Sequence, residues 1–103
     1  MTNQIQNPNV KKDRVIEMIE TILDPEVGLD IHTMGLIYDI KIKSEKEIYI
    51  LMTFTSPLCP VGEYLKQEVT DNMRELGFSA VEVEVTFEPP WQPPPALREA
   101  LGI

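Results

Sequence analysis

Hydrophobic residues recur at three- and four-residue spacing in two stretches of the chain, and this spacing is typical of amphipathic helices. The first stretch runs from Lys11 to Asp24, which precedes a proline and is therefore pushed out of helical geometry. The second stretch runs from Val61 to Leu76 and closes at Gly77, a residue type that favours a helix C-cap. The pattern thus predicts two helices, each with one apolar face.

Three other stretches alternate between apolar and polar positions, as strands with one buried face do. Residues 36–43 and 47–55 are joined by a short polar link, which predicts an antiparallel hairpin. Residues 80–87 place valines on one side and mainly glutamates on the other, so a half-buried strand is expected. The strand at 47–55 carries apolar residues on both faces, which predicts a central strand or a face covered by a partner.

The order helix, strand, strand, helix, strand predicts an α+β fold, a two-layer sandwich with both helices on one face of a three-stranded sheet. We expect a right-handed crossover between the second and third strands. The third strand is expected beside the first, in the order 2-1-3 with antiparallel neighbours. The predicted organisation is a flexible N-terminus at residues 1–10, one domain at 11–88, and a proline-rich arm with a short terminal helix at 89–103.

Composition and charge narrow the range of partners. The chain has 103 residues, and its 17 acidic against 9 basic residues give a net charge of −8, which repels nucleic acids and anionic membranes. We therefore expect neither as a partner, whereas a basic protein surface is acceptable. One cysteine forms no intramolecular disulfide, and the N-terminal segment lacks the features of a signal peptide, so a cytoplasmic location is expected.

Cys59 is the first candidate for chemistry because it lies between a predicted strand end and a predicted helix start. Pro60 suits the first helical position, and the unpaired N–H groups of a helix N-terminus favour a thiolate. Glu63, one turn further on, has the opposite effect, because its negative charge disfavours a thiolate. The alternative is that Cys59 is a small buried apolar residue. Position alone leaves both interpretations open.

The remaining candidates are polar residues with ordinary structural alternatives. Thr55 and Ser56 could line a pocket beside the sulfur, although threonine is a common strand residue and Ser-Pro a common turn. Asp24 and Glu26 could bind a hard cation, although such residues are more often solvated turn formers. His32 could act as a base for a nucleophilic Cys59, but a histidine in an irregular segment is usually a surface residue. In the arm, Trp91 is expected to pin the tail to the domain rather than to serve a proline-recognising partner.

Several separate motifs resemble, in order, the small metal-sulfur cluster assembly family first catalogued as domain of unknown function fifty-nine. This family includes bacterial iron-sulfur maturation factors of the sulfur-mobilisation type and the MMS-nineteen-interacting protein of eukaryotes. The motifs are DPEVGLDI at 24–31, TMGLIYDIKI at 33–42, TFTSPLCPVGEYL at 53–65, VEVEVTFEPPW at 81–91 and the closing LGI. The resemblance covers the chain from about Val15 to the C-terminus.

The resemblance implies a role in building iron-sulfur clusters or delivering them to apo-proteins. It places the family's reactive cysteine on Cys59, its acidic pair on Asp24 and Glu26, and its hydroxyl residues on Thr55 and Ser56. A transient cluster or iron would then be bound by Cys59, with the two carboxylates as further metal ligands. Implied partners are iron-sulfur assembly proteins and apo-targets, and a homodimer is compatible with the chain.

Two other functions compete with this maturation role. The first is a metal-free adaptor that docks a target through its sheet face and proline arm. The second is a thiol-dependent enzyme that uses His32 as a base for Cys59. His32 stands where the family has an apolar residue, which weakens the second alternative, and we expect a protein that is not an enzyme.

Overall fold

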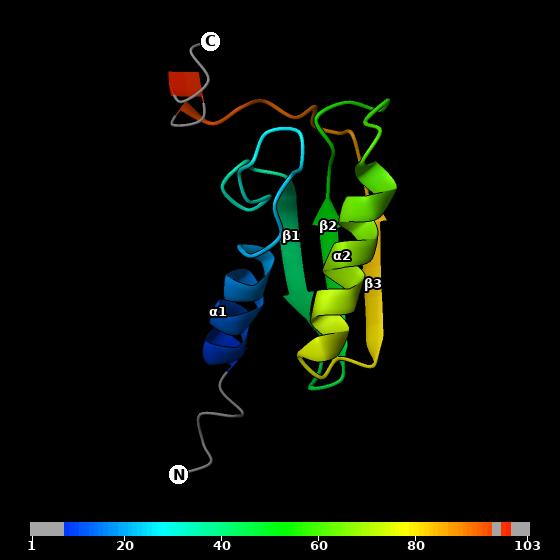
Figure 1. The fold of residues 1–103 in the computed structure, drawn as a ribbon. Coiled ribbons are helices and arrows are strands. Elements are labelled where there is room, and N and C mark those ends of the chain that lie inside the picture. Colours follow the sequence, from blue (N-terminus) through cyan, green and yellow to red (C-terminus); the bar gives the residue numbers. More distant parts are fainter. Residues whose placement is uncertain (1–7, 96–97, 100–103) are drawn as a thin grey trace.

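The two periodic stretches form helices and the three alternating stretches form strands, so the predicted α+β class is confirmed (Figure 1). The computed structural model describes residues 8–95, 98 and 99. Its elements are α1 (Pro8–Ile19), β1 (Ile37–Ile42), β2 (Glu47–Met52), α2 (Gly62–Glu75) and β3 (Ala80–Val85). No helix in this described part is long and apolar enough to cross a lipid bilayer.

The sheet order is β1-β2-β3, which corrects the expected order 2-1-3. β1 and β2 form the predicted antiparallel hairpin, but β3 pairs with β2 and runs parallel to it. The physical reason is burial. Alternate residues of β2 are fully buried, as a central position requires, whereas β1 and β3 are at most half-buried and occupy the two edges. Helix α2 returns the chain to the end of the sheet where β2 begins, so β3 follows β2 in the same direction.

Both helices cover the same face of the sheet, as expected. Ile48 and Ile50 of β2 are fully buried and share one hydrophobic core with Val15 of α1 and with Leu65 and Val69 of α2. Helix α1 also contacts α2, which closes this layer. The core therefore lies between one sheet face and the two helices.

Helix α1 spans a different part of the sequence than the periodicity predicts. It begins at Pro8, inside the stretch expected to be flexible, while residues 1–7 lie outside the described part. It ends at Ile19 rather than near Asp24, because the Thr21 hydroxyl donates to the Met18 carbonyl at 2.6 Å and tighter turns follow. Helix α2 ends as predicted, with Gly77 at a positive φ of 111° just after its last turn.

The proline-rich arm is fastened to the domain by its tryptophan, which confirms the expected clamp. The Trp91 indole N–H donates to the Met34 carbonyl at 2.7 Å, and the Tyr38 hydroxyl donates to the Pro89 carbonyl at 2.8 Å. Gly35 lies against the arm with a φ of 79°, a conformation that favours glycine, and a Cβ added there would be in ordinary contact with the Pro94 ring at 3.4 Å. Of the expected terminal helix, only Pro95, Arg98 and Glu99 are described as helical, and the rest lies outside the described residues.

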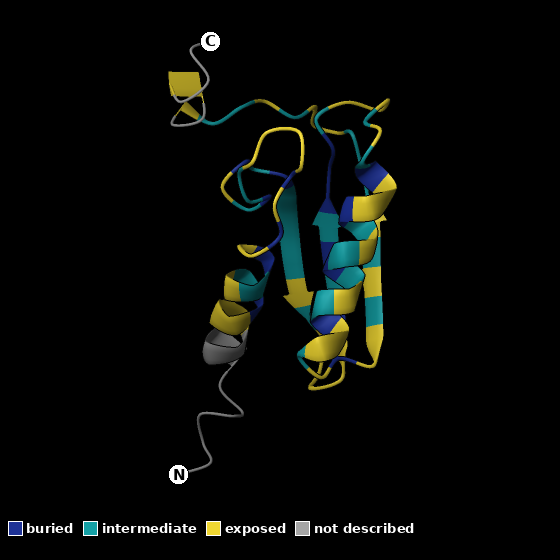
Figure 2. Ribbon diagram, viewed as in Figure 1, coloured by how far each residue is buried: buried dark blue, intermediate teal, exposed yellow. Residues whose placement is uncertain are grey.

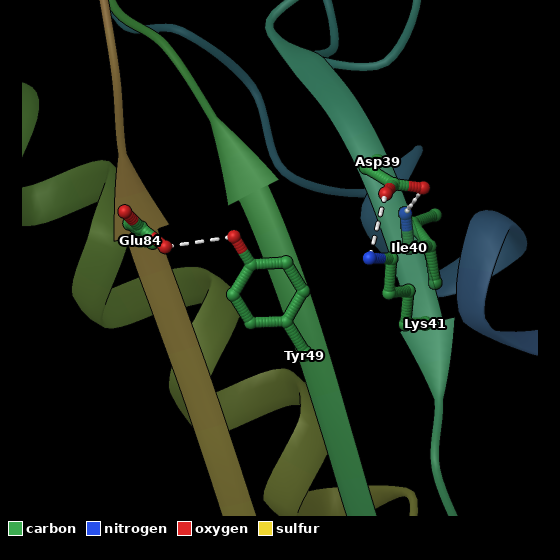
Figure 3. Close-up of polar contacts among 5 residues, drawn as sticks. All are labelled: Asp39, Ile40, Lys41, Tyr49 and Glu84. Carbon is green, nitrogen blue, oxygen red and sulfur yellow. Dashed lines mark hydrogen bonds and ion pairs between the residues drawn. The ribbon is translucent and has the colours of Figure 1, made fainter.

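The open face of the sheet carries a polar network centred on Tyr49 of β2 (Figure 3). Its hydroxyl donates to Glu84 of β3 at 2.7 Å, and this bond raises the pKa of Tyr49 to about 12. The ammonium groups of Lys41 and Lys43 lie 5.8 and 5.7 Å from the centre of the Tyr49 ring. Asp39 pairs with Lys41 at 3.8 Å. Charged side chains thus occupy the face opposite the core.

Candidate functional site

The residues singled out from the sequence gather at one end of the sheet. Ile37, Met52 and Val85 lie in one row across β1, β2 and β3. The loop before β1, the loop after β2 and the arm after β3 therefore leave the sheet at the same end (Figure 1). This arrangement brings the Asp24 loop, the Cys59 loop and the arm to one end of the molecule.

Cys59 sits in a turn that is fixed by Ser56. The Ser56 hydroxyl oxygen accepts a hydrogen bond from the Leu58 N–H at 3.1 Å, and the Ser56 carbonyl accepts one from the Cys59 N–H at 3.1 Å. Cys59 is half-buried and packs against the edge of the core. Cys59 is therefore held by a defined backbone and, as a residue, is neither fully buried nor fully exposed.

The helix start after Cys59 differs from the prediction. Helix α2 begins at Gly62 with Val61 as its N-cap, and Pro60 lies in a turn outside the helix. The Cys59 carbonyl accepts a hydrogen bond from the Gly62 N–H at 3.3 Å, which links the turn directly to the helix. Cys59 thus lies near the N-cap but before it. The prediction placed the helix start too early because Pro60 suits the first helical position, whereas in the structure it belongs to the turn that precedes the helix.

The ring of Phe54 packs against Gly62, the first residue of α2. The Phe54 ring lies so close to Gly62 that an added Cβ would be 2.5 Å from a ring carbon. Phe54 in turn meets Phe87 edge to face, with 6.1 Å between ring centres. Sequence reasoning missed this support. Its only signal was a glycine at the first position of a helix, where a larger residue would improve helix propensity.

Asp24 and Glu26 have different environments although they are two residues apart. Asp24 is 1% exposed, and its Oδ1 accepts a hydrogen bond from the Glu26 N–H at 2.7 Å. The Glu26 side chain is exposed. The same turn is closed by the Gly28 N–H, which donates to the Asp24 carbonyl at 2.7 Å. Asp24 therefore organises its loop, and Glu26 is the carboxylate that meets solvent.

The other predicted residues also differ in burial and partners. Thr55 is half-buried, and Ser56 is exposed and holds the cysteine turn. Thr53, two residues earlier, is fully buried and donates to the Phe54 carbonyl at 3.3 Å. The His32 Nδ1 lies 3.6 Å from a Glu20 carboxylate oxygen. The partner found for His32 is therefore a surface glutamate, which gives no support to its use as a base for Cys59.

The metal-binding capacity of the described residues is small. Within residues 8–95, 98 and 99, no cluster of three or more His, Cys, Asp and Glu side chains is arranged to hold a metal ion. At this end of the sheet Cys59 supplies the one thiol, and Glu26 is the exposed carboxylate of the Asp24 loop. A stable cluster requires about four thiolates or equivalent ligands, so this donor set does not fit a resident cluster in one chain.

Comparisons with known proteins agree with this fold and identify a family. The iron-sulfur cluster assembly protein family matches residues 12–85. The chain is 33% identical to the Bacillus subtilis Fe-S protein maturation auxiliary factor YitW, over 78% of this chain and 79% of that protein. It is 34% identical to the Staphylococcus aureus Fe-S protein maturation auxiliary factor SufT, over 68% of this chain and 81% of that protein.

A solved structure supports the same assignment. A conserved hypothetical protein from Thermotoga maritima superposes with a TM-score of 0.78 and 38% identity, covering 89% of this chain and 94% of that one. The resemblance stated from the motifs is thereby confirmed. The family match covers residues 12–85, and two relatives share about a third of their aligned residues with the chain. The chain therefore belongs to the iron-sulfur cluster assembly protein family.

Proposed function

We propose that this protein is an accessory factor in the maturation of iron-sulfur proteins and that Cys59 is the residue that contacts its cargo. Family membership and the names of the relatives support the maturation role. In this proposal the protein works in the cytoplasm with assembly proteins and apo-targets, and it binds and transfers rather than catalyses.

The observation that carries the role of Cys59 is its setting. It is the only cysteine of the chain, it is half-buried, and it lies in a turn held by two hydrogen bonds to Ser56. A thiolate is the soft ligand that iron and iron-sulfur clusters prefer. A fixed backbone keeps the sulfur aimed in one direction, which favours a ligand over a freely moving surface thiol.

The scarcity of other donors indicates how the cargo is held. One thiolate, even with a carboxylate such as the exposed Glu26, leaves a cluster with open positions that another protein must fill. Asp24 acts in this proposal by shaping the loop that presents Glu26, and Thr55 and Ser56 act by shaping the cysteine turn. Binding by this chain is then transient, because the cargo has a complete set of ligands only while two proteins share it.

The test is complementation in cells that lack the protein. We expect Cys59→Ala to lose most of the restored activity of iron-sulfur enzymes, while Ser79→Ala, an exposed serine at the other end of the sheet, restores it fully. Western blots must show equal amounts of both variants. Full restoration by Cys59→Ala would show that the thiol does not contact the cargo, and the maturation role would then have to rest on other residues.

A second experiment separates a cargo carrier from a metal-free adaptor. The purified protein is mixed anaerobically with iron and sulfide, and bound iron and visible absorption are measured for the wild type and Cys59→Ala. We expect charge-transfer absorption at less than one cluster per chain, and its loss in the variant. Equal absorption in both proteins would exclude Cys59 as the ligand.

A further inference from the structure

Exposed apolar side chains are concentrated around the candidate site. Among the described residues, four large hydrophobic side chains are exposed: Leu23, Val27, Leu58 and Tyr64, at 52%, 36%, 88% and 52%. Two of them bracket the Asp24 loop, and the other two bracket Cys59 along the chain. We refer to these four residues as the exposed apolar set. Figure 2 shows that the loops at this end of the sheet are largely exposed.

Leu58 is the most exposed of the set, and its backbone is fixed. It lies between Pro57 and Cys59 in the turn held by Ser56, and its own N–H is donated to the Ser56 hydroxyl at 3.1 Å. A leucine displayed on an ordered turn loses little conformational freedom when it enters a pocket. Side chains that are presented in this way act as anchors in protein interfaces.

The charged residues in the loops that carry the exposed apolar set are predominantly acidic. No Lys or Arg occurs in residues 15–40, 47–65 or 75–95, which include the Asp24 loop, the Cys59 loop and the arm as far as Pro95. Arg98, further along the arm, is the one cation described beyond Pro95. Carboxylates are present in each of these segments or directly beside them, for example at Glu26, Glu63 and Glu88. The lysines of the β1–β2 hairpin lie at the opposite end of the sheet, and Lys66 of α2 is the first cation after Cys59.

We propose that the exposed apolar set is a docking surface for a partner protein whose apolar pocket is ringed by lysine and arginine. Charge complementarity identifies this occupant, because the carboxylates around Leu58 attract a basic rim and repel an acidic one. A second copy of this chain would present the same carboxylates to one another, and an anionic membrane would be repelled as well. Leu58 and Tyr64 of this set flank Cys59 along the chain, so a docked partner could supply the ligands that the cargo lacks. This last point rests on the proposed function, whereas the docking surface itself does not.

The direct test uses a synthetic probe with the chemistry of the proposed rim and pocket. The probe is a fluorescein-labelled amphipathic peptide of leucine and lysine, and its two controls are a leucine–glutamate peptide and a serine–lysine peptide. Binding is measured by fluorescence anisotropy, and its location by amide chemical shifts of the ¹⁵N-labelled protein. We expect binding of the leucine–lysine peptide alone, with shifts centred on Leu23, Val27, Leu58 and Tyr64.

Two leucine variants make the test specific. Leu58→Ser should weaken binding about tenfold, since it removes a large apolar anchor. Leu51→Ser, the same change at a half-buried site on the open sheet face, should change affinity less than about twofold. Raising the salt concentration should weaken the wild-type complex severalfold, because the attraction between the charged rims is screened.

Several outcomes would overturn the proposal. Equal effects of the two leucine variants, shifts centred on the open sheet face, or tight binding of the leucine–glutamate peptide would each contradict it. Sedimentation that shows a dimer in the wild type and a monomer in Leu58→Ser would identify a second copy as the occupant. Cys59→Ala should bind the peptide normally, so a failure of the docking surface and a failure of Cys59 as ligand give different results.

Discussion

Two turns at the same end of the sheet have the same hydrogen-bond pattern but differ greatly in burial. In each, a polar side chain precedes a proline and accepts a hydrogen bond from the N–H two residues later. Asp24 accepts from Glu26 at 2.7 Å, and Ser56 accepts from Leu58 at 3.1 Å. Asp24 is 1% exposed, whereas Ser56 lies at the surface. Equivalent local geometry therefore has different consequences for stability.

Burial decides what each turn contributes. A buried carboxylate that loses its hydrogen-bonded N–H has little water to replace that partner. At an exposed turn, water replaces much of a lost hydrogen bond. We infer that the Asp24 turn is part of the folded core, while the Ser56 turn mainly determines how Leu58 and Cys59 are presented.

The largest effect is expected from removing the buried carboxylate. Asp24→Ala should lower the free energy of unfolding by about 3 kcal/mol, because it leaves a gap and an unsatisfied Glu26 N–H. Asp24→Asn retains an acceptor oxygen and should recover most of this loss. Urea denaturation followed by circular dichroism measures both values. A loss for Asp24→Ala no larger than that for Ser56→Ala would break the contrast between the two turns.

The second effect concerns the support beneath the Ser56 turn. Gly62→Ala should lower the free energy of unfolding by about 2 kcal/mol, since the new methyl group would press into the Phe54 ring. Shortening the ring in Phe54→Leu has its own cost, so the quantity of interest is the coupling in a double-mutant cycle. We expect Gly62→Ala to be less harmful in the Phe54→Leu background. Simple additivity would show that the ring does not limit the space at Gly62.

The third effect isolates backbone strain in the Asp24 turn. Gly28 has a φ of 83° and no atom within 4 Å of an added Cβ, so Gly28→Ala tests conformation without a steric clash. The free energy of unfolding should fall by about 1 kcal/mol. Gly77→Ala is the matched control, because it also combines positive φ with open space. A markedly larger loss at Gly28 than at Gly77 would mean that the Asp24 turn depends on more than its φ.

The smallest effect on stability should come with a clear effect on the thiol. Ser56→Ala should lower the free energy of unfolding by about 0.5 kcal/mol and speed the alkylation of Cys59 by iodoacetamide severalfold. The chain has one cysteine, so the labelling rate reports this site alone. Thr70→Ala, which removes a hydroxyl from the middle of α2, serves as the control. Equal labelling rates in both variants would show that Ser56 does not restrain the cysteine turn.

Sequence patterns predict the helices and strands of this fold better than they predict which strands lie next to each other. The valine–glutamate alternation of β3 and the glycine after α2 were read correctly because both are local properties. Strand order was wrong because the hydrophobic pattern of β3 fits either edge of a hairpin. The apolar residues on both faces of β2 predict a central strand, and the order β1-β2-β3 confirms that prediction, whereas the expected order 2-1-3 conflicts with it.

The candidate site shows the same contrast between local features, which the sequence predicts, and contacts between distant segments, which it does not. Candidate residue types were recognisable from motifs, but the burial of Asp24 and the exposure of Leu58 depend on how distant segments pack. The contact between Phe54 and Gly62 joins a strand end to a helix start and leaves no periodic signal. Pairing between His32 and Glu20 likewise arises only once the chain turns back after α1.

The arm's tryptophan gives the protein a built-in optical reporter. Trp91 is the only tryptophan of the chain, and its indole N–H is bonded to the Met34 carbonyl at 2.7 Å. The emission of a half-buried indole moves to longer wavelength when water replaces its protein partners. Detachment of the arm from the loop that leads into β1 can therefore be followed without any label, at the same end of the sheet that carries Cys59.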